Sequence, residues 1–403
     1  MIDFDVIVIG GGAAGMMAAA TAGGKVCLLE KNDSLGKKLA ITGGGRCNVT
    51  NATDVEGILE KTVNNPHFLY SALYSLTPDG MIDFLNKIGV ATKIEAAGRV
   101  FPISDSSLDV IKAFEQYLYK KGVDVRLNSD VTGISASEDF FTIHVNQKNL
   151  TARKVIIATG GMSFPTTGST GDGYQFAKVF GHKIIPPSPA LVPLVCDQAW
   201  MADVMGLSLQ NVRLAAKVKG RKLFDGIGEM IFTHFGISGP LVLSASAHMA
   251  GQNAANISID LLPNTNTAAL DKQFLDSFAK NPNRNLSNVL DEFLPKRLIP
   301  IIMSLSNISI DKKINAFTKE ERAGLIAQIK GLSLTITGTR GFKEAMISAG
   351  GIKTTEIDPS TMESKIIPRL FFAGEVIDVH ALTGGYNLQI AFSTGYLAAL
   401  SCS

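Results

Sequence analysis

The chain has few cysteines and no long apolar run, and both shortages exclude whole classes of protein. Its four cysteines, Cys27, Cys47, Cys196 and Cys402, lie far apart without C-x-x-C spacing. This argues against a disulfide framework, a redox dithiol and a cysteine metal site. No apolar segment reaches the length of a membrane span, and no basic region precedes the first apolar run, so we expect no signal peptide. These shortages predict a cytoplasmic protein with reduced thiols, no metal and no membrane partner.

The charge of the chain is almost balanced. Its formal net charge of +2 is too small to predict nucleic-acid binding by itself. The segment 186–340 is nonetheless basic, with 16 Lys and Arg against 12 Asp and Glu. Its densest basic run, Lys217-Val-Lys-Gly-Arg-Lys222, is typical of a solvated hairpin, and phosphate binding is the alternative interpretation. At 403 residues and 46% hydrophobic content, the chain should form more than one domain.

A glycine-rich fingerprint lies near the start of the sequence. The β-branched run from Asp5 turns through Gly10, Gly12 and Gly15 into an Ala-rich helix, which is the G-x-G-x-x-G pattern in its strand-turn-helix setting. The free N–H groups and the dipole at the start of such a helix attract a pyrophosphate. A second strand ends at Glu30, where this fold places a carboxylate on the adenosine ribose. The segment therefore predicts a dinucleotide site.

The end of the sequence decides between the dinucleotides. Nicotinamide and flavin cofactors share the first half-site, so the fingerprint alone leaves the choice open. A strand over 369–373 ends in Gly374-Glu375, whose carboxylate suits ribityl hydroxyls, and Gly384-Gly385 opens an apolar helix over 388–400. The start of that helix can face the electron-rich edge of a flavin. This pairing of two distant segments favours FAD.

The segment between these two ends reads as an insertion. Pro186-Pro-Ser-Pro189 marks the exit from the first domain, because proline continues neither a helix nor a central strand. Short strands between Leu191 and Leu262 predict a small barrel or sandwich. Short amphipathic helices follow between Thr267 and Lys330.

Several sequence blocks together resemble one known family. They are Thr42-Gly-Gly-Gly-Arg-Cys-Asn-Val-Thr-Asn51, Ala158-Thr-Gly-Gly161 with Gly168 to Gly173, Phe232-Thr-His-Phe-Gly-Ile-Ser-Gly-Pro240, Thr361 to Lys365, and Ala373 to Gln389. From about residue 4 to 400 the chain resembles the BaiN-like flavoproteins, also described as NAD(P)/FAD-dependent oxidoreductases or aminoacetone-oxidase-type FAD-binding enzymes. His380-Ala381 departs from the family pattern, where an acidic residue or glycine is more usual.

The resemblance implies an α/β fold in which a Rossmann-like FAD-binding domain is interrupted by a small β-barrel and a helical lid. We expect the FAD-binding domain at 1–188 and 340–403, the barrel substrate domain at 189–263 plus 332–339, and the lid at 264–331. The fingerprint and the resemblance together predict these cofactor contacts: Gly10, Gly12, Ala13, Ala14, Gly15, Glu30, Lys31, Gly43, Gly44, Gly45, Arg46, Asn48, Val131, Ala158, Thr159, Gly160, Gly374, Glu375, Asp378, Gly385, Asn387 and Leu388.

Three residues are the candidates for catalysis. Arg46 would donate to the polar edge of the flavin or to its phosphates, with an ion pair or a helix cap as the alternative. Cys47 is a proton donor or simply a small buried residue. His234 is a candidate general acid, or a histidine whose hydrogen bonds hold its turn. His380 and Tyr386 are weaker candidates of the same kind.

Three functions follow from a flavin in this setting. The first is reduction of a conjugated C=C bond, in an enone such as a steroid or in the uracil of ribosomal RNA, which would become dihydrouridine. The second is oxidation of a small amine by O₂, and the third is a flavin-bearing interaction protein without catalysis. Gly168 to Gly173 is not a second fingerprint, so NAD(P)H would bind only transiently near the flavin. The sequence leaves the oligomeric state open.

Overall fold

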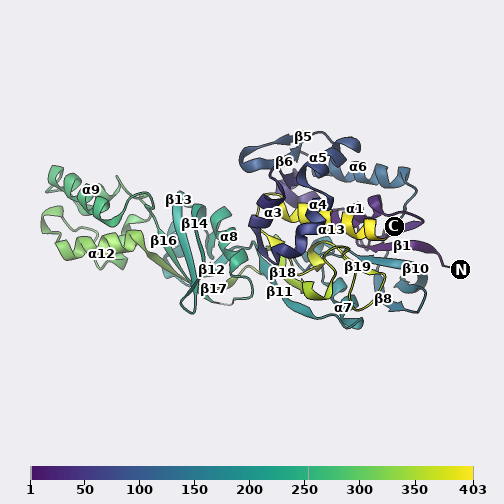
Figure 1. Cartoon of the computed structure of the whole chain (residues 1–403). Helices are drawn as coiled ribbons and strands as arrows, with labels where there is room; N and C mark the ends of the chain where they lie inside the picture. Colours follow the sequence, from purple (N-terminus) through teal and green to yellow (C-terminus); the bar gives the residue numbers. More distant parts are fainter. Residues whose placement is uncertain (1, 253, 403) are drawn as a thin grey trace. The chain divides into compact units, whose positions relative to one another are not determined.

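The computed structural model describes residues 2–252 and 254–402. The chain divides into two compact units, each traced in Figure 1. Unit 1 comprises Met1–Pro189 and Phe342–Ser403, and unit 2 comprises Ala190–Gly341. Unit 1 is therefore assembled from the two ends of the sequence, and unit 2 is one continuous insertion. The sheets of the described residues fall within these units, apart from β11, which ends at the boundary.

Unit 1 is built around a twisted sheet in which the first strand is central. β1 (Phe4–Ile9) pairs in parallel with β2 (Val26–Leu29) on one side and β10 (Lys148–Ile157) on the other. Its apolar residues are buried on both faces, which explains why the strand is a continuous Val/Ile run without alternation. The sheet is completed by β7 (Asp124–Arg126), β19 (Leu370–Phe372), β8 (Val131–Ala136) and β9 (Phe141–Val145).

Two helices from opposite ends of the sequence pack together in unit 1. α1 (Ala13–Thr21) and α13 (Tyr386–Ser401) lie side by side, and Figure 1 draws them in purple and yellow. A Cβ at Gly395 would lie 2.3 Å from the carbonyl oxygen of Ala14, so only glycine permits this contact. Both helices are apolar around most of their circumference because neighbouring elements bury them on several sides. The C-terminal segment therefore completes the core that the N-terminal segment begins.

Further helices and three small sheets surround this core. The sheets pair β3 (Thr50–Asn51) with β6 (Arg99–Pro102) and β5 (Thr92–Ile94), β4 (Thr62–Asn64) with β20 (His380–Ala381), and β11 (Ile184–Ala190) with β18 (Ile347–Ile352). The α-helices are α2 (Lys37–Ile41), α3 (Val55–Lys61), α4 (Tyr70–Ser75), α5 (Pro78–Lys87), α6 (Ser107–Lys120) and α7 (Asp172–Val179). Short 3₁₀ helices include η1 (Thr42–Gly45), η2 (Pro66–Leu69) and η8 (Gly374–Val376).

Our interpretation of the proline cluster was wrong in one respect. Pro186, Pro187 and Pro189 lie inside strand β11, which we had not expected to be a strand. A two-stranded sheet leaves one edge of β11 without a ladder partner, and proline is tolerated at such an edge. The cluster nevertheless stands where the chain leaves unit 1, between Pro189 and Ala190.

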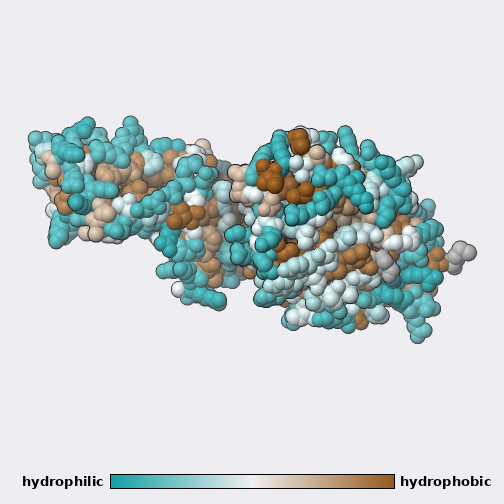
Figure 2. Space-filling view, turned by 45° about the horizontal axis from the view of Figure 1, so that its top comes forward, coloured by the Kyte–Doolittle hydropathy of each residue, from teal (hydrophilic) through white to brown (hydrophobic). Residues whose placement is uncertain are grey.

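Unit 2 contains a closed barrel of six strands. Their order is β12 (Leu194–Cys196), β15 (Gly236–Ser238), β14 (Arg221–Phe232), β13 (Ser208–Val218), β16 (Ala255–Asp260) and β17 (Leu332–Thr339). Residues alternate between a buried inner row and an exposed outer row, as in Ile257, Ile259 and Leu334 against Asn256, Ser258 and Thr335. Much of the face of unit 2 shown in Figure 2 is hydrophilic. Of the two predicted arrangements of these strands, a small barrel or a sandwich, the structure has the barrel.

Helices complete unit 2. α8 (Pro240–His248) packs on the barrel, and α9 (Thr267–Lys280), α10 (Leu286–Leu290), α11 (Ile299–Leu305) and α12 (Lys319–Lys330) follow β16. Thr318 and Glu321 form a capping box that fixes the start of α12. The predicted fold class, a Rossmann-like α/β domain interrupted by a barrel and helices, is confirmed. None of the helices in the described part of the chain is long and apolar enough to cross a membrane.

Candidate functional site

The glycine-rich turn joins β1 to α1 through two sterically required glycines. A Cβ at Gly10 would lie 2.5 Å from the carbonyl oxygen of Ala158, and one at Gly15 would lie 1.8 Å from that of Gly10. Gly10 also has a φ of +105°, which side chains strongly disfavour. These glycines are needed to fold the turn.

Gly12 is different because the space around it is open. It is the N-cap of α1, no side chain caps this helix, and a Cβ at Gly12 would meet no atom within 4 Å. The first N–H groups of α1, on Ala13, Ala14 and Gly15, therefore face an open region with a favourable dipole. This is the geometry that binds phosphate groups at a helix start.

Glu30 stands at the end of β2, beside this turn. Its carboxylate accepts hydrogen bonds from the backbone N–H of Gly11 at 2.7 Å and of Asn32 at 2.8 Å, and from the Asn32 amide at 2.6 Å. These bonds hold a buried carboxylate that forms no ion pair with any residue the structure describes. The neighbouring Lys31 is already paired, because its Nζ lies 2.6 Å from Asp172.

Other predicted residues lie at the ends of neighbouring strands, and Ala158 and Thr159 lie beside Gly10. Ala158, Thr159 and Gly160 directly follow β10, and Val131 is buried at the start of β8. The hydroxyl of Thr159 is buried and has no hydrogen-bond partner among the described residues. The structure thus brings these side chains and the fingerprint into one unit.

The block Thr42–Asn51 forms an irregular turn of left-handed glycines. Gly43, Gly44 and Gly45 all have positive φ, and a Cβ at Gly44 or Gly45 would meet nothing within 4 Å. Nearby, Asn48 has a buried Oδ1 that no described residue contacts by a hydrogen bond. Open backbone and a buried polar atom without a partner are features suited to binding a ligand.

The start of α13 packs onto this block. A Cβ at Gly385 would lie 2.3 Å from the carbonyl oxygen of Thr50, so the approach requires glycine. The Asn51 amide donates to the carbonyl of Gly384 at 3.0 Å, and the Thr50 hydroxyl donates to Gln389 at 2.6 Å. The two blocks that were predicted to hold the flavin are therefore in contact.

Two other predicted residues are used by the protein itself. Asn387 accepts from the backbone N–H of Ala381 at 2.9 Å and donates to its carbonyl at 2.8 Å. Asp378 accepts from the side chains of Asn64 at 2.7 Å and Asn65 at 3.2 Å. Both hold the loop around β20 in place, whereas Leu388, in the first turn of α13, remains partly exposed.

Glu375 has a partner that the sequence did not reveal. Its carboxylate lies 2.5 Å from the Nζ of Lys38 and accepts hydrogen bonds from the Ser163 hydroxyl at 2.7 Å and the Ser348 backbone N–H at 2.8 Å. Burial alone would raise the pKa of Glu375, but Lys38 and the hydrogen bonds more than offset it, so this pKa is lowered. Nothing in the tandem Lys37-Lys38 indicates which lysine turns inward.

The three catalytic candidates have unequal surroundings. The guanidinium of Arg46 pairs with Asp105 at 2.6 Å and with Glu95, and it lies 4.2 Å from the centre of the Phe101 ring. Cys47 is fully buried with a φ of +61°, and burial raises the pKa of its thiol to about 12. Arg46 therefore forms the ion pair that was its alternative role, and Cys47 is the small buried residue that was its alternative role.

The third candidate, His234, lies in unit 2 between β14 and β15. Its side chain is exposed, and its ring contacts Phe235 edge to face at 5.0 Å. All the other predicted site residues lie in unit 1. The weaker candidates His380 and Tyr386 lie in β20 and at the start of α13.

These observations fit an extended flavin dinucleotide. The open helix start at Gly12, the carboxylate of Glu30, the open glycines Gly44 and Gly45, and the unpaired Asn48 offer groups suited to its phosphates, ribose and ring. In the described ranges, no group of three or more His, Cys, Asp or Glu could hold a metal ion.

The whole sequence matches one protein family. Residues 4–401 match the family described as HI0933-like protein Rossmann domain. The chain belongs to this family. It is an FAD-dependent oxidoreductase, and the resemblance predicted from the sequence blocks is confirmed.

Two curated relatives of the HI0933-like chain cover almost its full length. A ribosomal RNA dihydrouridine synthase of Escherichia coli (strain K12) is 34% identical over 399 residues, 98% of this chain and 97% of that protein. A 3-dehydro-bile acid delta(4,6)-reductase of Clostridium scindens is 33% identical over 379 residues, 93% of this chain and 91% of that protein. Among solved structures, a 3-ketosteroid delta1-dehydrogenase of Sterolibacterium denitrificans aligns over 99% of both chains with a TM-score of 0.51 at 14% identity, which shows a shared fold.

Proposed function

We propose that this protein reduces a C=C bond that is conjugated to a carbonyl group. The observation that carries the proposal is the nearly equal similarity to two relatives whose names describe one bond change on different substrates. In a 3-keto steroid with double bonds at positions 4 and 6, and in uracil, the reduced bond is conjugated to a carbonyl. Both products need a hydride on the β carbon and a proton on the α carbon.

The proposed role of unit 1 is to hold and polarise the cofactor. When bound, FAD supplies the hydride for this reaction. The N–H groups at the start of α1 would hold its phosphates, and Glu30 would accept from ribose hydroxyls. α13 begins at Gly385 without a side-chain cap, so its dipole favours negative charge at its start. Lys38 would hold Glu375 in its charged form.

His234 is the proposed proton donor. Cys47 is a poor acid near neutral pH because burial raises the pKa of its thiol to about 12. Arg46 is held by two carboxylates, and a guanidinium does not release its proton in proteins. His234 has an exposed side chain of the type that most often transfers protons. We propose NADPH or NADH as the electron source, binding transiently because the sequence has one dinucleotide fingerprint.

The test is an anaerobic half-reaction experiment on the purified protein loaded with FAD. Loss of the visible flavin absorbance on adding NADPH or NADH, followed by its return on adding a 3-keto-4-ene steroid or a uridine-containing RNA, supports the proposal. His234→Ala should retain FAD and slow only the return, with His234→Gln as the isosteric control. The proposal is wrong if neither acceptor restores the absorbance of a flavin that dithionite has reduced. It is also wrong if a small amine removes the absorbance of the oxidised flavin.

A further inference from the structure

We propose that the outer face of the barrel around the β13–β14 hairpin binds the phosphodiester backbone of RNA. This inference rests on the proposed function and specifies its substrate as a uracil within an RNA chain. It concerns unit 2 only, and it uses residues that the FAD site does not.

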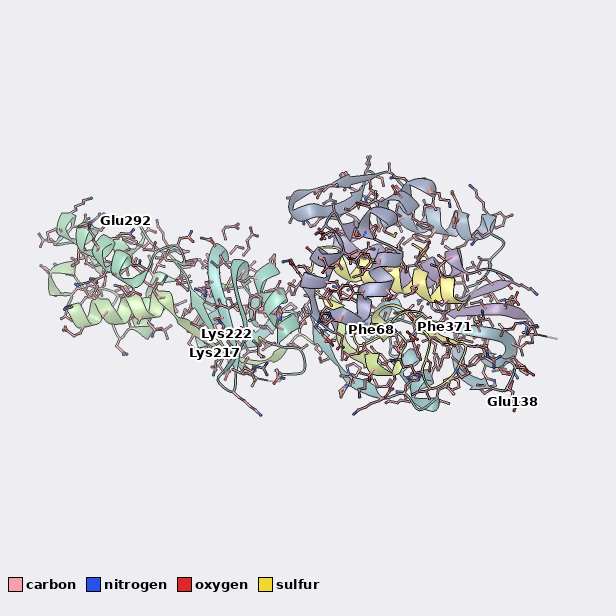
Figure 3. The ribbon with its side chains drawn as sticks, in the orientation of Figure 1. Phe68, Glu138, Lys217, Lys222, Glu292 and Phe371 are labelled. Carbon is pink, nitrogen blue, oxygen red and sulfur yellow. The ribbon has the colours of Figure 1, made fainter. Side chains whose placement is uncertain are left out.

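The first support is a row of outward side chains across four neighbouring strands. Lys222 on β14 pairs with Lys217 on β13, which pairs with Asn256 on β16, which in turn pairs with Thr335 on β17. All four residues are exposed. Figure 3 shows Lys217 and Lys222 side by side on the barrel. Like charges directly opposite each other destabilise a sheet, and Asp225 offsets the charge of Lys222, so among the residues described Lys217 is the cation of this pair that is free to meet an anion.

The second support is the turn of the hairpin. Val218 pairs with Arg221, which leaves Lys219 and Gly220 as a two-residue loop with φ of +48° and +81°. Positive φ at both positions is the type I′ turn, in which asparagine or glycine is preferred at the first position. Lysine there gives up turn stability and adds a third cation to Lys217 and Arg221.

The third support is the pairing of nearby carboxylates. Asp225 is shared by Arg213 at 2.7 Å and Lys222 at 3.0 Å, and Asp260 pairs with Lys330 at 2.6 Å. Glu229 lies farther along β14. Within the described ranges, no carboxylate forms an ion pair with Lys217, Lys219 or Arg221. The hairpin end therefore keeps an excess of positive charge.

The surface beside these cations is hollow and carries small polar groups. A pocket of about 490 Å³ is lined by Lys217, Lys219, Gln252, Asn256 and Thr335, among others. Ser258 and Ser333 form the next outward pair along β16 and β17. Hydroxyl and amide groups bind phosphate and sugar oxygens without reading sequence. The residues that line this pocket include two lysines and no acid, which suits the negatively charged backbone of RNA.

The experiment measures binding of a fluorescein-labelled, uridine-containing RNA stem-loop to the FAD-loaded protein by fluorescence anisotropy at several KCl concentrations. Each phosphate contact contributes about 0.9 to the slope of log K against log salt concentration. Lys217→Gln/Lys219→Asn/Arg221→Gln should weaken binding at least about tenfold and lower that slope by up to about 3. The matched control, Lys272→Gln/Lys280→Gln, removes exposed charges from α9 in the same unit and should bind RNA as the unchanged protein does.

Lys219→Asn alone separates binding from folding. Asparagine is favoured in this turn, so the variant should unfold at an equal or higher temperature while binding RNA more weakly, by a few-fold. Equal RNA affinity of the triple variant and the unchanged protein would overturn the inference, as would an equal loss in the α9 control.

The two proposals fail in different ways. If a small enone reoxidises the flavin of the unchanged protein but no RNA binds, the barrel inference is wrong and the proposed C=C reduction stands. If RNA binds through the hairpin but neither acceptor reoxidises the flavin, the proposed reaction is wrong. The triple variant should keep its rate of reoxidation by the enone, because its substitutions change neither His234 nor the residues proposed to hold FAD.

Discussion

The two ends of the proposed FAD site in unit 1 are stabilised in different ways. At the proposed adenosine end, Glu30 accepts hydrogen bonds from Gly11, 19 positions away, and from Asn32, two positions away. At the ring end, Lys38 reaches Glu375 across 337 positions, and Thr50 reaches Gln389 across 339. The first end is therefore encoded by a short continuous segment, whereas the second exists only when the C-terminal segment is docked. A local motif can therefore predict one end of a binding site, whereas the contacts at the other end depend on tertiary structure.

The largest expected effect contrasts two glycines within one turn. Gly15→Val should destabilise the apoprotein by at least about 3 kcal/mol, because its Cβ would overlap the carbonyl of Gly10. Gly12→Val should leave apoprotein stability unchanged yet abolish FAD binding, since its side chain would fill the open space at the start of α1. Urea unfolding and bound-flavin absorbance measure the two effects. A Gly12→Val protein with full yellow colour would move the phosphates elsewhere.

A second contrast breaks the ring end alone. Lys38→Met should cost about 2 to 3 kcal/mol by leaving the partly buried Glu375 without its cation, whereas Lys37→Met removes only an exposed pair with Asp33. With Lys38 present, the lowered pKa of Glu375 contributes stability above the unfolded-state pKa, and this contribution is lost as pH falls through the folded pKa. Without Lys38, burial should raise the pKa of Glu375. The difference in unfolding free energy between the unchanged protein and Lys38→Met should therefore become smaller as the pH falls toward about 4. Urea unfolding across pH measures it, and a constant gap would contradict this account.

A third change tests the adenosine end. Glu30→Gln places an amide donor against one of the N–H groups of Gly11 and Asn32. We expect a loss of about 1 to 2 kcal/mol in stability and FAD affinity about tenfold lower. Titration of the apoprotein with FAD measures the affinity. Unaltered affinity would show that the carboxylate serves only the turn.

The smallest expected effect is that of Cys47→Ala. The thiol is buried and its pKa is raised to about 12, so turnover should fall by less than about threefold. Alanine keeps the small volume and the same positive φ, so the fold should persist. A loss of about a hundredfold at unchanged FAD content would make Cys47 the proton donor after all.

The sequence predicted the glycine-rich turn and the position of Glu30 after β2, because both depend on local spacing, whereas adenosine binding there stays a prediction. Spacing among Gly10, Gly12 and Gly15 specifies the turn, and the acid at Glu30 follows one strand later. The ring end was predicted as a set of blocks but not as a set of contacts. Asn387 stays a predicted cofactor residue, and its side chain forms hydrogen bonds with the backbone of Ala381 that the sequence did not reveal.

Long-range pairing explains what the sequence could not show. Arg46 is held by two acids, Glu95 and Asp105. Both lie far from Arg46 in the sequence, so no local pattern predicts these ion pairs. The choice between barrel and sandwich depended on β12 pairing with β17, whose strands are separated by most of unit 2. The proline cluster was misread because an edge strand tolerates what a central strand does not.

The interruption of unit 1 by unit 2 also imposes an order on synthesis. In a nascent chain, β1 and α1 leave the ribosome long before α13 does. At about 5 to 20 residues per second, residues 190–401 take on the order of 10 to 40 seconds to translate. Unit 2 can fold during that delay, while the Ala- and Met-rich surface of α1 waits for its covering helix. We therefore expect FAD to bind only after α13 has been translated.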